Sequence, residues 1–365
     1  MNTGIHQSCT AYERLANEVR DLIAKGEVRA DGFIASEYDL ARRFDMSRMT
    51  VRKGSELLIA EGIVQRLPGR GLFLAQDTAP KRKTIWVLVD NLAREPSVRL
   101  SRRIQKWAAE YSCDIQLMDG HGDVERNLVL LNELTARDDV SGAIITAWHT
   151  SECIEALCRL KDTGLPFVVL DHHNTYFSVP NVVADNYHGG RMAAEHFLEN
   201  GHRNFAFIGD CKTITVRYRL DGFRDYLSEQ GVLLSHPNIG NLHPDDRFSD
   251  WAEWVEQKME KIFGGGRTNR PTALFVSCDN LARGVYRWCA RNGVRIPEDL
   301  SVIGFDDDPV VQWLNPELTT IAQPFSEMGD KAIELLDSQI KGKPWDGKEC
   351  ILPVELIVRG SVRKI

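Results

Sequence analysis

Apolar side chains recur at helical spacing along the first 60 residues of the chain. The first pattern predicts an amphipathic helix over residues 11–25, with apolar positions at Tyr12, Leu15, Val19, Leu22 and Ile23. Two more helices are expected to begin after Ser36 and after Ser47, because a serine side chain can accept hydrogen bonds from the free N–H groups at a helix start. Since only residues 45–47 separate these two helices, the sequence predicts a pair joined by a tight turn.

Two short apolar segments, 63–67 and 72–75, follow the third predicted helix. The four residues between them include Gly69 and Gly71, which permit the positive backbone angles of a hairpin turn. Helix, helix, tight turn, helix and hairpin is the element order of a winged helix-turn-helix. We therefore expect residues 1–76 to form a small α+β DNA-binding domain.

The third helix and the hairpin tip carry the side chains expected to contact DNA. A helix fits the major groove, where arginine can bind guanine through two hydrogen bonds and threonine can contact base edges or methyl groups. The exposed side of the helix offers Arg48, Thr50, Arg52 and Lys53. Arg70, at the hairpin tip, can reach the minor groove or the DNA backbone. The alternative is that these are only solvated basic residues on a small helical domain.

The stretch SEYDLARRFDMSRMTVRKGSELLIAEGIVQRLPGRGLFLA, residues 36–75, resembles the winged helix of the GntR family. The shared motifs are SE, LA, F-x-x-S-R-x-T-V-R, EG and G-R-G. This resemblance implies DNA contacts from Ser36, Ser47, Arg48, Thr50, Arg52, Gly69, Arg70 and Gly71. The sequence departs from the family pattern at Tyr38, where Arg is usual, at Ile34-Ala35 in place of Leu-Pro, and at Gly54 within the recognition helix. Glycine inside a helix costs about 1 kcal/mol relative to alanine.

Beyond a polar, basic segment that we interpret as a linker (77–84), short apolar runs alternate with helical stretches. The expected strands are Ile85–Val89, Ile115–Met118, Ala143–Ile145, Phe167–Leu170, Phe205–Ile208, Leu274–Val276 and Val302–Phe305. Continuous apolar strands are buried on both faces, as in parallel sheets covered by helices. Residues 85–365 are therefore expected to form an α/β body with one large sheet or two smaller ones.

Several of these strands end in aspartate, at positions 90, 171, 210, 279 and 306. Ligands of open α/β sheets bind beyond the carboxyl ends of the strands. Carboxylates at those ends can accept hydrogen bonds from several hydroxyl groups, which suits a sugar or another polyol. The alternative is that each aspartate caps the helix after it, and the sequence favours the ligand for Asp171 and Asp306 more than for Asp279.

The body resembles the effector domain of LacI/GalR regulators, which is similar to periplasmic sugar-binding proteins. The matching stretches include VVADNYHGGRMAAEHFLENGHRNFAFIGD, RYRLDGFRDYL, PTALFVSCDNLARGVYRWCARNGVRIPEDLSVIGFDD, NPELTTIAQPFSEMG and ILPVELIVRGS. The resemblance implies a periplasmic-binding-protein-like body of two lobes, each a parallel sheet with helices on both faces. We expect the first lobe to comprise about 85–183 and 323–345, and the second about 184–322 and 346–361. A GntR-type head on such a body resembles the arabinose-repressor group.

The resemblance also implies an effector site between the lobes. Asp171 and Asp306 match carboxylates that accept ligand hydroxyls, and Arg217 matches an arginine that binds ligand oxygens through its planar, forked head. Cys278 stands before Asp279 where relatives usually carry Asn, so the effector or its pose is expected to differ from the usual hexose case. Aromatic residues in loops that could stack on a sugar ring, or pack in the core or rim, are Trp148, Tyr176, Phe248 and Trp313.

Charge is divided unevenly along the chain, whose net charge is −7. Residues 1–83 carry 14 Lys and Arg against 11 Asp and Glu, whereas the remainder carries 31 against 41. A basic head on an acidic body indicates that only the head contacts a polyanion.

Composition excludes several other classes of protein. No apolar run approaches the ~20 residues of a membrane helix, and the first residues lack the pattern of a secretory signal. The eight cysteines show no CxxC spacing, so we expect reduced thiols in a cytoplasmic protein without a metal or cofactor. His149, His172 and His173 follow strands and could in principle support catalysis. Adjacent histidines on an extended chain point to opposite sides, so we expect no catalytic residue.

Together these features predict a transcriptional regulator, and we expect a repressor. Its partners would be operator DNA, a small sugar-like effector and a second copy of the chain in a homodimer. The effector would control operator affinity by favouring one conformation of the body. Two alternatives stay open: a sugar-binding module whose head docks another protein, and an enzyme that uses the space between the lobes.

Overall fold

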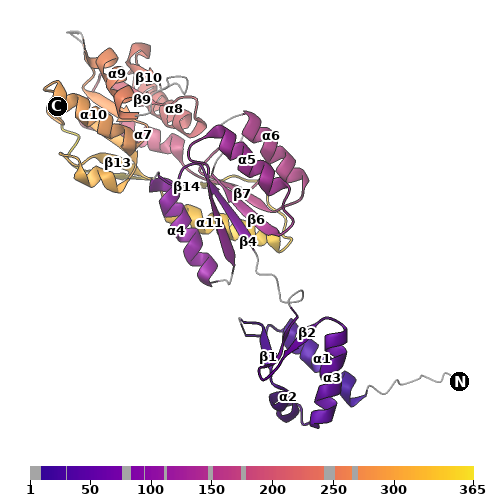
Figure 1. The fold of residues 1–365 in the computed structure, drawn as a ribbon. Coiled ribbons are helices and arrows are strands. Elements are labelled where there is room, and N and C mark those ends of the chain that lie inside the picture. Colours follow the sequence, from indigo (N-terminus) through magenta and orange to yellow (C-terminus); the bar gives the residue numbers. More distant parts are fainter. Residues whose placement is uncertain are drawn as a thin grey trace. The chain divides into compact units, whose positions relative to one another are not determined.

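The computed structural model describes residues 10–29, 31–75, 84–93, 95–110, 113–146, 151–173, 178–241, 251–264 and 270–365. The chain forms two units, 1–82 and 83–365. Figure 1 colours the chain from indigo at the N-terminus to yellow at the C-terminus and labels many of its helices and strands.

The first unit contains three helices and a three-stranded antiparallel sheet. The helices are α1 (Ala11–Ala24), α2 (Glu37–Arg43) and α3 (Arg48–Ala60). The sheet has the order β1-β3-β2, with β1 (Phe33–Ala35), β2 (Val64–Leu67) and β3 (Gly71–Leu74). Its core is built from Leu15, Ala16, Val19, Leu40, Val51, Leu58, Val64 and Leu72. The predicted winged helix-turn-helix is confirmed, and strand β1 is an addition that the sequence pattern did not indicate.

The first lobe of the second unit is a six-stranded parallel sheet of order β14-β8-β7-β6-β4-β5. Its strands are β4 (Thr84–Val89), β5 (Asp114–Asp119), β6 (Val140–Ile145), β7 (Phe167–Leu170), β8 (Asn181–Ala184) and β14 (Cys350–Leu352). One face packs on α5 (Val124–Thr135) and α6 (Ser151–Asp162), and the other on α4 (Glu95–Glu110) and α11 (Phe325–Ile340).

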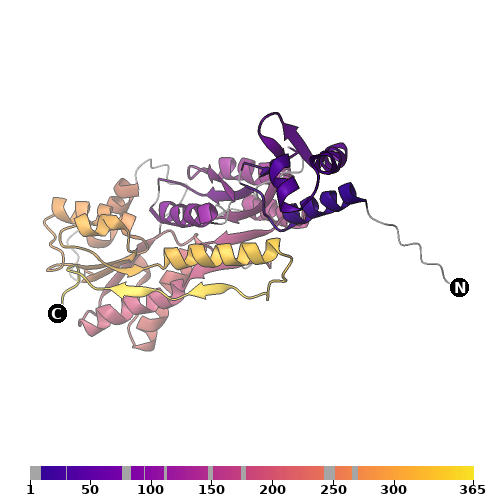
Figure 2. The ribbon, with the colours of Figure 1, turned by 90° about the horizontal axis from the view of Figure 1, so that it is seen from below.

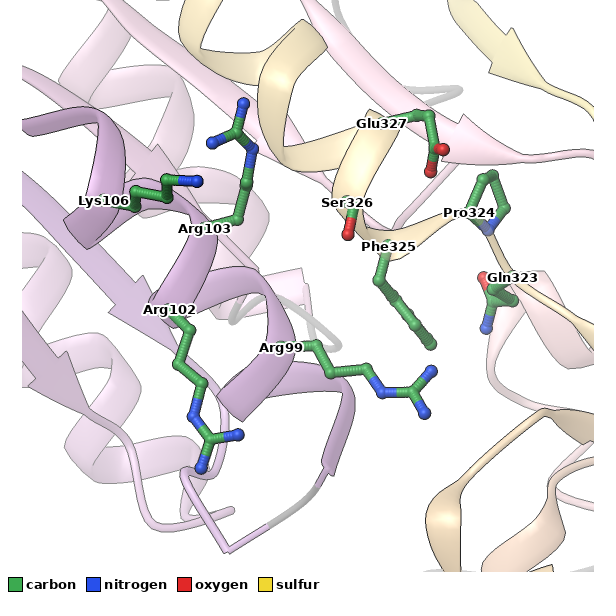
Figure 3. Close-up of a pocket in the computed structure, with 9 residues that line it drawn as sticks. All are labelled: Arg99, Arg102, Arg103, Lys106, Gln323, Pro324, Phe325, Ser326 and Glu327. Carbon is green, nitrogen blue, oxygen red and sulfur yellow. The ribbon is translucent and has the colours of Figure 1, made fainter. Parts of the chain in front are cut away.

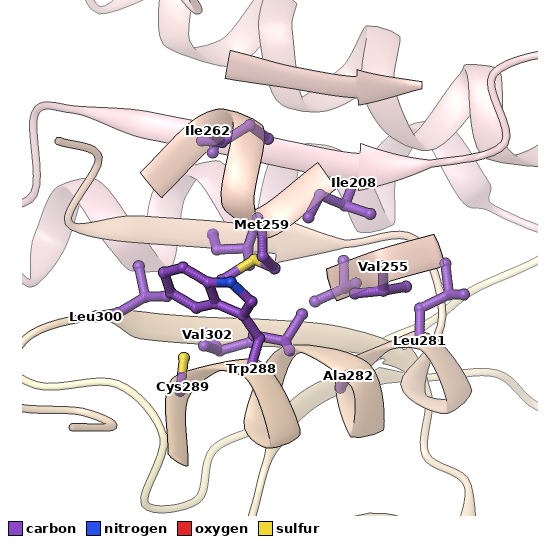
Figure 4. Packing of buried hydrophobic residues seen from close by; sticks show 14 of the residues in the cluster. Ile208, Val255, Met259, Ile262, Leu281, Ala282, Trp288, Cys289, Leu300 and Val302 are labelled. Carbon is purple, nitrogen blue, oxygen red and sulfur yellow. The ribbon is translucent and has the colours of Figure 1, made fainter. Parts of the chain in front are cut away.

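The second lobe is a six-stranded sheet of order β10-β9-β11-β12-β13-β15, in which only the β13–β15 pair is antiparallel. Its strands are β9 (Phe205–Gly209), β10 (Ile239–Asn241), β11 (Ala273–Val276), β12 (Ser301–Asp306), β13 (Thr319–Ala322) and β15 (Glu355–Ile357), with 3₁₀ turns η1 (His236–Asn238) and η2 (Pro309–Trp313). Helices α7 (Asn186–Glu199) and α8 (Ile214–Glu229) cover one face. Helices α9 (Trp251–Phe263) and α10 (Asp279–Arg291) cover the other, where Met259 and Trp288 pack against strand residues such as Val302 (Figure 4).

The chain passes between the two sheets three times, after β8, after β13 and after β14. Figure 2 shows the last passage, where β14 and β15 follow one another from one sheet to the other. The sequence-based division placed all of 346–361 in the second lobe, but Cys350–Leu352 pairs with β8 in the first. This edge strand is only three residues long, incompletely buried and followed at once by Pro353, so its apolar residues do not stand out as a strand of the first lobe.

Among the described residues, no helix is both long enough and apolar enough to cross a lipid bilayer.

Candidate functional site

The two serines at the helix starts of the first unit are helix caps. The Ser36 hydroxyl accepts a hydrogen bond from the Asp39 N–H at 3.1 Å, and the Ser47 hydroxyl accepts one from the Thr50 N–H at 3.1 Å. Each cap satisfies a donor that the helix itself leaves free, and a cap of this kind contributes roughly 1 kcal/mol. Ser36 thus fixes where α2 begins, and Ser47 fixes where α3 begins.

One side of α3 is open to solvent and strongly basic. Arg48, Arg52 and Lys53 are exposed and Thr50 is half-buried, whereas Val51, Gly54, Ser55 and Leu58 are buried against the rest of the unit. Met49 stands beside the basic residues and is 67% exposed. We call Arg48, Met49, Thr50, Arg52 and Lys53 the α3 surface. Its shape and charge suit the major groove of DNA.

Gly54 has a packing role that helix propensity does not reveal. A Cβ atom at this position would lie 2.7 Å from Leu15 Cδ2 and 2.7 Å from the Tyr12 carbonyl oxygen. Such distances are closer than real contacts, so glycine is needed where α3 crosses α1. Gly54, which departs from the family pattern, therefore sets the distance between α1 and α3.

The tip of the β2–β3 hairpin is formed by Gly69, Arg70 and Gly71. Both glycines have positive φ, 71° and 108°, and a Cβ on Gly71 would lie 2.8 Å from the Ala35 carbonyl oxygen. The Arg70 guanidinium lies 5.1 Å from the centroid of the Phe73 ring. The hairpin therefore places one exposed cation at a tip whose backbone only glycine readily adopts.

In the second unit, four side chains from the two lobes meet at the carboxyl ends of the strands. We call Asp171, His173, Arg219 and Asp306 the junction cluster. Asp171 and His173 follow β7 in the first lobe, Asp306 ends β12 in the second, and Arg219 lies on α8. Asp171 and Asp306 have positive φ, 64° and 112°, a conformation that side chains other than glycine rarely adopt and that is concentrated at functional sites.

Arg219 is the central cation of the junction cluster and is 5% exposed. Its Nη1 lies 3.6 Å from Asp306 Oδ1 and donates to the Ser277 carbonyl at 2.5 Å, while its Nε donates to Asn186 Oδ1 at 2.7 Å. The guanidinium carbon lies 3.6 Å from the centroid of the Phe305 ring. These contacts hold a planar donor in place beside Asp306 and close enough to Asp171 to attract its carboxylate.

The two carboxylates of the junction cluster titrate far above the ordinary range. Burial raises the pKa of Asp171 to about 7, and Arg219 opposes this increase. Burial likewise raises the pKa of Asp306 to about 6, against the effects of Arg219 and of the hydrogen bond from Gln323. Asp171 Oδ1 is buried and accepts no hydrogen bond from the described residues. Perturbed and unsatisfied buried acids of this kind mark candidate binding sites.

His173 connects the two lobes within the cluster. Its Nδ1 lies 3.1 Å from Glu349 Oε2, and its ring centroid lies 4.3 Å from that of Tyr218 on α8. The sequence suggested a metal centre or an acid–base pair for this histidine and did not single out Tyr218. The geometry instead places both where the lobes face each other.

Arg217, the arginine expected at the ligand, is exposed on α8 and lies outside the cluster. Arg219, two residues later, occupies the buried position. The helical spacing contained the signal, because Arg219 shares the buried face of α8 with Thr215 and Phe223, each four residues away. The assignment of Arg217 therefore does not agree with the geometry.

Asp279 and Cys278 differ in their surroundings from the cluster acids. Asp279 is fully buried and accepts hydrogen bonds from the Thr320 hydroxyl at 2.7 Å and from the Asp308 N–H at 2.9 Å. One of its oxygens thus holds β13 and the other holds the loop after β12, and burial raises its pKa well above the usual value. Cys278 is the N-cap residue of α10, and burial raises the pKa of its thiol to about 12.

Of the four aromatic residues that could contact the ligand, one lies in the part of the chain that the structure describes. Trp148, Tyr176 and Phe248 lie outside the described part of the chain. Trp313, at the end of η2, is 87% exposed.

Comparisons with known proteins agree with the two-part organisation. The family described as "Bacterial regulatory proteins, gntR family" matches residues 11–74, and the "Periplasmic binding protein-like domain" matches residues 194–362. The chain is 26% identical over 361 residues to the arabinose metabolism transcriptional repressor of Geobacillus stearothermophilus, covering 97% of this chain and 98% of that protein. It is 30% identical over 286 residues to the transcriptional regulator DegA of Bacillus subtilis, covering 78% of this chain and 82% of the relative.

A solved structure decides the family of the body. The LacI family transcriptional regulator from Enterococcus faecium, crystallised with bound ribose, is 30% identical and aligns over 78% of this chain and 100% of that one, with a TM-score of 0.65. This chain belongs to the LacI family of transcriptional regulators. Its head, however, is of the GntR type. The regulator is thus a DNA-binding head joined to a periplasmic-binding-protein-like body.

Proposed function

We propose that this regulator is a repressor whose operator affinity is controlled by a small sugar-like effector bound at the junction cluster. The observation that carries the proposal is Arg219, a buried cation that pairs with Asp306 and attracts the Asp171 carboxylate at the carboxyl ends of strands from two lobes. Support comes from relatives named as an arabinose metabolism repressor and as a LacI-type regulator with bound ribose.

The chemistry of the cluster suits neighbouring hydroxyl groups. The carboxylates of Asp171 and Asp306 can each accept a hydrogen bond from a ligand hydroxyl. The Arg219 guanidinium, which pairs with Asp306, can donate hydrogen bonds to ring or hydroxyl oxygens of the same ligand. His173 and Tyr218 add a planar, partly apolar surface. We assign to Arg219 the role first expected of Arg217. We propose that Cys278 and Asp279 stabilise the structure around the site and do not bind the effector directly. The Cys278 thiol is protonated, and both Asp279 oxygens already accept hydrogen bonds from the protein.

In the head, we propose that the α3 surface reads the operator and that the hairpin tip follows the DNA backbone or minor groove. The side chains available for DNA contacts on the α3 surface are Arg48, Thr50, Arg52 and Lys53. Arg70 at the hairpin tip is available for the backbone or minor-groove contact. Ser36 and Ser47 position α2 and α3 through their caps. We propose that their hydroxyls, which lie at the helix starts, also contact DNA phosphates. This assigns 1–76 to the DNA-binding domain and 77–84 to the linker.

We further propose that the regulator acts as a cytoplasmic homodimer without a catalytic role. Helix-turn-helix dimers bind paired half-sites, so two heads are needed for a pseudo-palindromic operator. Trp313 supports a self-association surface on the second lobe, because a tryptophan that is 87% exposed gains from being covered.

The decisive experiment compares two arginines of one helix. Operator binding by Arg219→Gln and Arg217→Gln is measured by fluorescence anisotropy, with and without a panel of sugars. We expect Arg219→Gln to bind operator but to lose the response to the effector, and Arg217→Gln to keep both. An unaltered sugar response in Arg219→Gln would show that the effector binds elsewhere.

A further inference from the structure

A groove of about 450 Å³ lies between α4 and the N-terminal end of α11. Four basic side chains of α4 line it, and residues 323–327 form the opposite wall (Figure 3). The basic residues are Arg99, Arg102, Arg103 and Lys106. Glu327 is the acidic residue of the lining, and its carboxylate extends away from the guanidinium groups of Arg99 and Arg102 in this view. The groove is therefore a positively charged concavity outside the junction cluster.

One end of the groove suits an oxyanion. Figure 3 shows the head groups of Arg103 and Lys106 on the same side of α4, with Ser326 on α11 across the groove. Arg103 pairs with Asp330 at 2.5 Å, whereas the exposed Lys106 ammonium has no ion pair or hydrogen bond among the described residues. Ser326 is in the first turn of the 16-residue helix α11, where backbone N–H groups have no intrahelical acceptor and the helix dipole is positive.

The other end of the groove offers a buried acceptor. Gln323 is 7% exposed, and its Nε2 donates to Asp306 Oδ1 at 2.7 Å. Its Oε1 is buried and accepts no hydrogen bond from the described residues. A buried amide oxygen without a donor is unfavourable by about 1–3 kcal/mol, so a hydroxyl group brought by a ligand would be stabilised there.

The groove is also connected to the second lobe. The Arg99 side chain extends towards Gln323 (Figure 3), and its Nη2 donates to the Asp307 carbonyl at 2.8 Å. Gln323 itself joins β13 of the second lobe to α11 of the first. A ligand in the groove would thus contact the segment through which the chain passes between lobes, one hydrogen bond from Asp306.

We propose that this groove is a second ligand site, which binds a small phosphate monoester that carries hydroxyl groups. The phosphate lies at Arg103, Lys106 and the first turn of α11, and a hydroxyl donates to Gln323 Oε1. Because Gln323 also holds Asp306, occupancy of the groove changes the affinity of the junction cluster for its own ligand. By linkage, that ligand changes the affinity of the groove by the same factor.

Binding is tested by calorimetry on the full chain, without DNA or sugar, so that failure here leaves the proposed function untouched. The probes are glycerol 3-phosphate, glycerol and inorganic phosphate at matched ionic strength. We expect glycerol 3-phosphate to bind with a Kd on the order of 1 mM or lower, and to bind more tightly than either part alone. Absence of binding, or equal binding of inorganic phosphate, would overturn the proposal.

Two charge-neutral variants of α4 locate the site. Lys106→Gln removes an exposed cation without breaking an ion pair or hydrogen bond among the described residues, and we expect it to weaken glycerol 3-phosphate binding about fivefold or more. Arg102→Gln is the matched control, because it removes the same charge from the same helix but its guanidinium extends away from Arg103 and Lys106 in Figure 3. Equal weakening by both variants would show attraction by general charge and would contradict a built site.

Discussion

The guanidinium of Arg48 lies over the ring of Tyr38, 5.4 Å from its centroid. Arg48 opens the recognition helix, and Tyr38 stands on α2 where GntR relatives usually carry arginine. The aromatic ring restricts the rotamers of Arg48 before DNA arrives, and a cation–π contact at an exposed site contributes about 0.5–1 kcal/mol. The residue that replaces a family contact thus holds its neighbour in position.

Removing the arginine tests base reading. We expect Arg48→Ala to weaken operator binding by about 1–3 kcal/mol and to reduce discrimination against random DNA. The measurement is a competition titration with operator and scrambled duplexes at fixed salt. An equal loss on both duplexes would identify Arg48 as a phosphate contact.

Removing the ring tests the positioning. Tyr38→Ala should weaken operator binding by a smaller amount, about 0.5–1 kcal/mol, whereas Tyr38→Phe should retain most of the affinity because the aromatic face remains. The same titration measures both. If the two variants lose affinity equally, the tyrosine hydroxyl and not the ring contributes.

Alanine at Gly54 separates helix propensity from packing. Propensity alone would stabilise the head by about 1 kcal/mol, but the new Cβ would lie 2.7 Å from the Tyr12 carbonyl oxygen. Overpacking of this kind costs about 1–3 kcal/mol, so we expect Gly54→Ala to lower the unfolding temperature of the head. Lys53→Ala, an exposed neighbour, serves as the control, and a stabilised Gly54→Ala variant would contradict the steric argument.

The pKa values of the junction carboxylates predict a pH dependence of stability. Because the folded-state pKa of Asp171, about 7, lies above the ordinary value of 3.8, the native state binds more protons than the unfolded state. Asp171 therefore stabilises the fold relatively more at low pH, and its contribution is lost as pH rises from about 4 to about 7.

Urea unfolding at several pH values, for the wild type and Asp171→Asn, measures this contribution. The variant should lose part of the decline in unfolding free energy between about pH 4 and about pH 7, since asparagine does not ionise. Identical pH profiles would mean that Asp171 keeps an ordinary pKa.

Trp313 provides a test of self-association. We expect Trp313→Arg to shift the chain from dimer to monomer in sedimentation and to weaken operator binding, because one head then contacts one half-site. If the variant forms a dimer of unchanged stability, the interface lies elsewhere on the body and does not include Trp313.

Local patterns predicted most of the fold but not the details of the site. Serine caps, glycine turns and apolar runs are short-range signals, and they located the helices of the head and the central strands of both sheets. The sequence did not indicate β14 because this edge strand is only three residues long, incompletely buried and followed at once by Pro353. The resemblance pointed to Arg217 and did not consider Arg219, whereas burial on one face of α8 distinguishes the two arginines. The Gln323–Asp306 hydrogen bond joins residues 17 positions apart, so only the folded chain brings them together.

The triple passage of the chain between the sheets has a consequence for biosynthesis. Helix α11 and β14 complete the first lobe, although they are translated after nearly all of the second. Neither half of the body can be excised as one uninterrupted piece, and a nascent chain must emerge almost to its end before either core closes. A premature stop codon near residue 320 would therefore damage both halves at once.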